Sequence, residues 1–169
     1  MELNTNTKKI ALLGVLTAAA FILNYLESLL PVFIPVPGVK IGLANIAVLV
    51  ALYVLGMGYA GVLAVVRIVL AGFTFGSLFS MLYSFAGCLL SMLVMLALKR
   101  IKRFSVIGVS VAGGVAHNMG QLLCALFLVG TSIFYYAPFL IASGVAAGLI
   151  TGAVVKLTLN MFPPRAGNG

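Results

Sequence analysis

The stretch VAGGVAHNMGQLLCALF, residues 111–127, combines an apolar run long enough to form part of a membrane-spanning helix with three neighbouring polar side chains. These are His117, which is the only histidine in the chain, Asn118 and Gln121. Positions three and four apart share a helix face, so His117 and Asn118 both neighbour Gln121. Three glycines in the segment would let another backbone or a ligand come close: Gly113, Gly114 and Gly120. Since polar groups at membrane depth are costly, we expect the rest of the chain to enclose this strip, although the three side chains could simply hydrogen-bond between helices.

The composition of the chain indicates that lipid is its solvent. Of the 169 residues, 63% are hydrophobic and only 7% are charged, which is more apolar surface than a soluble domain of this size can bury. The net charge of +8 would suggest nucleic acid as the partner of a soluble protein. Here most basic residues lie in short loops and tails, so the partner that we expect is the lipid bilayer, with no nucleic acid.

The hydropathy pattern predicts an all-α integral membrane protein with a single domain over residues 1–169 and six transmembrane helices. The expected spans are 8–30, 41–55, 58–70, 77–98, 104–129 and 135–159. A proline-rich connector, PVFIPVPGVK at residues 31–40, separates the first two spans and acts either as an inert loop or as a lid. Residues 71–76, AGFTFG, are expected to form a turn.

The distribution of basic residues predicts that both termini are cytoplasmic. With the N-terminus inside, the inner segments hold Lys8, Lys9, Lys99, Arg100, Lys102, Arg103, Lys156 and Arg165. The outer segments hold only Lys40, and Arg67 falls within a span. Such an excess on one side is typical of the cytoplasmic face, here that of the bacterial cytoplasmic membrane.

Once the direction of each helix is assigned, a rise of about 1.5 Å per residue gives the depth of each polar side chain. The polar side chains of the spans then gather in the outer half: Asn24, Glu27, Lys40, Asn45, Arg67, Tyr83, Ser84, His117, Asn118 and Gln121. The inner halves are almost purely apolar. We therefore expect a pocket open to the outside, with substrate-binding residues Glu27, Lys40, Asn45, Arg67, Tyr83, His117, Asn118 and Gln121.

Several of these residues have a second interpretation. Arg67 and Glu27 could form an internal ion pair, or Arg67 could meet an anionic ligand group, because a guanidinium matches carboxylate and phosphate geometry. Lys40 could simply mark the membrane surface. Gly14 and Ala18 form a small-xxx-small face that serves either helix packing within the bundle or docking to a partner.

The sequence argues against an enzyme. It contains no aspartate, no pair of carboxylates, no His/Cys cluster for a metal and no P-loop pattern, so we expect no catalytic residues, metal or cofactor. Prenyl-diphosphate chemistry requires acidic side chains to hold magnesium. Any energised transport must take ATP hydrolysis from another subunit.

Two segments, VPGVKIGLANIAVLVALY at residues 36–53 and HNMGQL at residues 117–122, resemble the Gx transporter family, also labelled heptaprenyl diphosphate synthase component I. The resemblance extends over about residues 8–159. The family is similar in design to the substrate-binding S-components of energy-coupling factor (ECF) transporters, six-helix membrane proteins that dock on a T-component and two ATPases. Their docking face is an AxxxA pattern on the first helix, and the nearest equivalent here is Gly14–Ala18.

These observations lead to one functional hypothesis and one rival. The hypothesis is an S-component-like subunit that binds a small vitamin-, quinone- or isoprenoid-related molecule for uptake, energised by separate ATPase subunits. The rival is a non-catalytic scaffold subunit of a prenyl-diphosphate synthase or of a quinone or flavin electron-transfer complex. In the rival, the polar strip contacts another protein or a quinone.

Overall fold

The computed structural model describes residues 5–29, 42–101 and 103–161, and all regular structure in these ranges is helical, as the hydropathy pattern predicts. The elements in chain order are α1 (Thr5–Leu29), α2 (Leu43–Val54), α3 (Met57–Phe75), α4 (Leu78–Arg100), α5 (Val106–Val129), the 3-10 helix η1 (Thr131–Tyr136) and α6 (Ala137–Met161). The proline-rich connector lies outside the described residues.

Five helical segments of the described chain are long and apolar enough to cross a membrane: α1, α3, α4, α5, and η1 together with α6. The exception is α2, which has 12 residues and therefore reaches only about 18 Å. A bilayer core is about 30 Å thick. The chain is thus a multi-pass helical membrane protein, while six crossings and cytoplasmic termini stay predictions.

The turn expected at residues 71–76 is wrong, because α3 continues as a helix through Phe75. The Thr74 hydroxyl donates to the Leu70 carbonyl oxygen at 2.7 Å, which satisfies this polar group inside the helix. The Phe75 ring packs against Phe21 and Tyr25 of α1, with ring centroids 5.3 and 6.0 Å away. Contacts with a distant helix therefore override the local turn signal.

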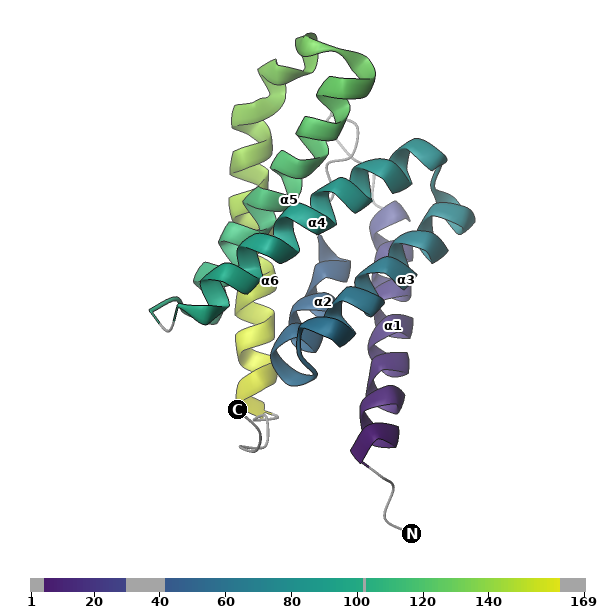
Figure 1. The fold of residues 1–169 in the computed structure, drawn as a ribbon, viewed down its shortest axis with the longest axis vertical. Helices are drawn as coiled ribbons and strands as arrows, with labels where there is room; N and C mark the ends of the chain where they lie inside the picture. Colours follow the sequence, from purple (N-terminus) through teal and green to yellow (C-terminus); the bar gives the residue numbers. More distant parts are fainter. Residues whose placement is uncertain (1–4, 30–41, 102, 162–169) are drawn as a thin grey trace.

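The helices form two sets of three, which meet along α3–α4 and α2–α6 contacts (Figure 1). In the first set α1 packs against α2 and α3, and in the second α5 lies between α4 and α6. The start of α1 and the end of α6 lie at the same end of the molecule (Figure 1). Residues near the end of α1 and the start of α2 therefore lie toward the opposite end.

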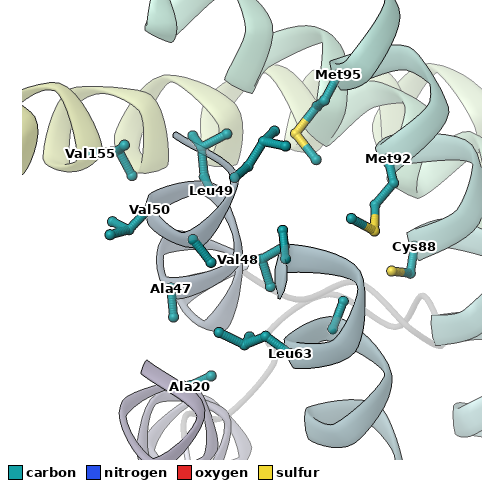
Figure 2. Packing of buried hydrophobic residues seen from close by; sticks show 14 of the residues in the cluster. Ala20, Ala47, Val48, Leu49, Val50, Leu63, Cys88, Met92, Met95 and Val155 are labelled. Carbon is teal, nitrogen blue, oxygen red and sulfur yellow. The ribbon is translucent and has the colours of Figure 1, made fainter. Parts of the chain in front are cut away.

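The short helix α2 occupies the centre of the apolar core. Seven of its residues are buried, and Figure 2 shows four of them, Ala47 to Val50, among side chains from other helices. Those neighbours come from α1, α3, α4 and α6: Ala20, Leu63, Cys88, Met92, Met95 and Val155. Helix α2 carries almost no polar residue beyond its first turn, which fits its position among apolar side chains from four other helices.

Glycines bring α5 into backbone contact with both of its neighbours. A Cβ atom on Gly148 of α6 would lie 2.5 Å from the Cα of Val111, so no larger residue fits there. On the other side, a Cβ atom on Gly120 of α5 would lie 2.6 Å from the Ala86 carbonyl oxygen of α4. Of the two uses expected for the glycines in residues 111–127, close approach of another backbone is thus observed at Gly120.

Candidate functional site

A cavity of about 370 Å³ lies between the two sets of helices, and all six α-helices contribute to its wall or rim. Its volume falls in the range of ligand pockets. The lining residues are Asn24, Glu27, Ser28, Gly42, Asn45, Arg67, Ile68, Ala71, Gly72, Phe75, Gly76, Ser77, Ser80, Met81, Ser84, Gly114, His117, Asn118, Gln121, Gly144 and Ala147.

The cavity lies in the half of the molecule away from the described ends of the chain. Its residues come from the last turns of α1, the first turn of α2, the second half of α3 and the first half of α4. The core around α2 fills the other half. The structure therefore brings the polar side chains together on the side where the sequence predicts a pocket.

Six of the eight residues expected to bind substrate line this cavity: Glu27, Asn45, Arg67, His117, Asn118 and Gln121. Tyr83 is not among the lining residues, and its neighbour Ser84 lines the cavity instead. Neighbouring residues of a helix differ by a rotation of about 100° around its axis. Tyr83 therefore lies at nearly the same height on α4 as Ser84, but on a helix face that does not line the cavity. Lys40 lies outside the described residues.

Asn24, Ser80 and Ser84 also line the cavity, although they were not expected to bind substrate. Asn24 lies three residues before Glu27 on α1, and Ser80 lies four residues before Ser84 on α4, so each pair shares a helix face. The signal that could have found Asn24 and Ser84 is their depth, which matches that of the other polar residues. Ser80 gave no such signal.

Arg67 is the central charged group of the cavity. Its side chain projects from α3 with only 8% of its surface exposed, and its Nη2 donates to Asn45 Oδ1 at 2.7 Å. Its Nε is buried and has no hydrogen-bond partner among the described residues. A buried donor without a partner costs about 1–3 kcal/mol, and more on a charged group. The guanidinium is thus held in place but only partly satisfied.

Glu27, the only acidic residue in the described chain, is bound to the backbone at the start of α2. Its Oε1 accepts a hydrogen bond from the Gly42 N–H, directly before the first residue of α2. The positive end of the α2 dipole favours a carboxylate at this position. Glu27 and Arg67 line the same cavity, and an ion pair between them stays a prediction.

The polar strip of α5 divides its hydrogen bonds between helix packing and the cavity. Asn118 Nδ2 donates to the Leu140 carbonyl oxygen at 2.8 Å and to Ser143 Oγ at 3.0 Å, which ties α5 to α6. Gln121 Nε2 lies 3.2 Å from His117 Nε2 on the preceding turn. The interhelical interpretation is therefore correct for the amide nitrogen of Asn118, while all three side chains still line the cavity.

The remaining basic residues of the described chain lie away from the cavity. Lys99, near the end of α4, donates to the Leu52 carbonyl oxygen at 2.6 Å, and its Nζ lies 4.9 Å from the centre of the Tyr53 ring. Leu52 and Tyr53 belong to the end of α2 opposite the cavity. Lys8 and Lys9 begin α1, whose other end lines the cavity.

The proposed docking residues, Gly14 and Ala18, are exposed on α1. A Cβ atom on Gly14 would meet no heavy atom within 4 Å. Packing within the bundle is therefore not their role among the described residues, and docking to a partner stays a prediction. Also within the described part of the chain, no three His, Cys, Asp or Glu side chains lie close enough to hold a metal ion.

Long apolar helices around a polar cavity define a multi-pass membrane protein with a candidate binding pocket in one half. A family model described as heptaprenyl diphosphate synthase component I matches residues 16–158, and the chain belongs to this family. The match confirms the family resemblance of the segments at residues 36–53 and 117–122. Comparisons with curated proteins and with solved structures find no match.

Proposed function

We propose that the protein is the substrate-binding subunit of an uptake system in the bacterial cytoplasmic membrane, similar in role to an ECF S-component. The observation that carries this proposal is the cavity, because polar side chains from five apolar helices, α1 to α5, converge on one cavity of ligand size. Some of these groups also bond between helices, Asn118 of α5 to α6 and Arg67 of α3 to Asn45 of α2, but the same side chains still line the cavity.

The distribution of charge supports an outward-facing cavity. Lys8, Lys9, Lys99 and Arg100 all lie at helix ends remote from the cavity, and such clusters mark the cytoplasmic side. Both termini would then be cytoplasmic, and a solute would enter from outside. Since the sequence contains no nucleotide-binding motif, ATPase subunits and a T-component would supply the energy, with the exposed Gly14–Ala18 face of α1 as the docking surface.

The second candidate is a non-catalytic scaffold subunit, and the family description favours it. That description names one component of a synthase, which implies partner subunits. In such a complex the polar cavity would receive a quinone or a segment of another subunit.

A binding screen on the purified full-length protein separates the two functions. For a capture subunit we expect vitamin-like or quinone-related solutes to raise the melting temperature saturably, because a ligand that binds only the folded state stabilises it. His117→Ala and Arg67→Ala should each abolish this shift. Absence of any response, together with tight co-purification with a synthase or redox subunit, would favour the scaffold.

A further inference from the structure

The hydrogen bonds already made inside the cavity restrict what a ligand can offer. On the α3 side, Asn45 Oδ1 accepts from Arg67 Nη2, and the Nε of Arg67 is left without a partner among the described residues. One edge of the planar guanidinium carries this Nε–H together with one of the two Nη2–H groups. A carboxylate accepts two parallel hydrogen bonds from such an edge.

Glu27 does not bond to the Nε of Arg67, which has no hydrogen-bond partner among the described residues. Its Oε1 is held by the Gly42 N–H, where the α2 dipole offsets part of its charge. Arg67 makes its hydrogen bond to a neutral amide oxygen, that of Asn45. The arginine therefore keeps capacity for one further anionic group.

The α5 side of the cavity offers a hydrogen-bond acceptor, whereas the α3 side offers donors. Asn118 makes two hydrogen bonds in the described chain, both through its amide nitrogen, and one acceptor is the Leu140 carbonyl oxygen, so the orientation of the amide is fixed. Its Oδ1 has no partner among the described residues and is the atom left for the cavity. This wall therefore offers an acceptor to a ligand donor.

We propose that the cavity takes a small organic monocarboxylate, with its carboxylate on the guanidinium edge of Arg67 and a hydroxyl or amine donor directed at Asn118 Oδ1. This inference rests on the proposed solute-binding function and names its substrate class. It excludes a diphosphate as the preferred ligand, because Arg67 is the only cationic lining residue in the described chain and Glu27 lines the same cavity. Further negative charges would be desolvated without a partner.

The test uses titration calorimetry on the full-length protein in detergent with matched carboxylate and amide pairs. The probes are acetate and acetamide, benzoate and benzamide, and 4-hydroxybenzoate and 4-hydroxybenzamide, with inorganic pyrophosphate as the competing anion. We expect carboxylates to bind more tightly than their amides and 4-hydroxybenzoate more tightly than benzoate. Arg67→Gln should weaken carboxylate binding by roughly tenfold or more, since it removes a charge-assisted hydrogen bond.

The matched control is Arg100→Gln, which removes one arginine charge at the exposed end of α4, far from the cavity, and should leave every affinity unchanged. Equal binding of amides and carboxylates, or tighter Arg67-dependent binding of pyrophosphate, would overturn the substrate class while leaving solute capture intact. If no probe binds while a vitamin-like or quinone-related solute of the thermal screen does, the substrate class falls and the capture function stands; if none of them binds, both fall.

Discussion

At the scale of single residues, Asn118 both joins two helices and lines the cavity. Its amide nitrogen ties α5 to α6 through the Leu140 carbonyl oxygen and Ser143, while its oxygen remains available in the cavity. A polar residue at membrane depth thus serves helix packing and lines a cavity at the same time. The effect of an Asn118 substitution on protein stability must therefore be measured before any change in ligand affinity is interpreted.

We predict that Asn118→Leu lowers the free energy of unfolding by about 1 kcal/mol, because interhelical hydrogen bonds in membrane proteins have this order of strength. The measurement is thermal unfolding of the purified protein in detergent. Thr158→Val is the control, since the Thr158 hydroxyl bonds only within its own helix, to the Val154 carbonyl oxygen. Equal losses in both variants would contradict the tie between α5 and α6.

At the scale of the helices, α5 is the best-fixed element of the cavity wall. Backbone contacts at Gly120 and Gly148 hold it against α4 and α6, so the rotation of His117 and Gln121 toward the cavity is set by packing on both sides. The opposite wall, at the end of α3, depends on the ring contacts of Phe75 with α1.

Gly148→Ala should therefore destabilise the protein by about 1–3 kcal/mol, because the new methyl group would force α6 away from Val111. Thermal unfolding again provides the measurement. In Gly58→Ala the added methyl group meets nothing within 4 Å, and this exposed helical position should tolerate alanine or gain slightly. Similar melting temperatures for the two variants would argue against a glycine contact between α5 and α6.

At the scale of the whole molecule, the predicted orientation can be tested with two positions on α1. Ser28 lines the cavity near one end of this helix, and Thr7 is exposed at the other. In a background carrying Cys88→Ala and Cys124→Ala, we expect Ser28→Cys to react with a membrane-impermeant maleimide added outside intact cells. Thr7→Cys should react only after permeabilisation, and the reverse pattern would invert the proposed topology.

Much of this arrangement can be predicted from the sequence. Once the direction of each helix is assigned, the position of a residue along the helix gives its depth in the bilayer. Depth alone predicted that Glu27, Arg67 and His117 lie in the same half of the membrane, and all three line one cavity in the structure. Rotation about a helix axis is not fixed by depth, which is why Tyr83 was expected in place of Ser84. The end of α3 likewise depends on ring contacts with α1 that no local pattern encodes.

The central position of α2 has a consequence for how the chain enters the bilayer during synthesis. Twelve residues, buried on all sides in the finished protein, are too few to cross a membrane alone. Only the short link Leu55–Gly56 separates α2 from the longer α3, so the pair forms a hairpin long and apolar enough to leave the translocation channel together. We therefore expect α2 to enter the bilayer only together with α3.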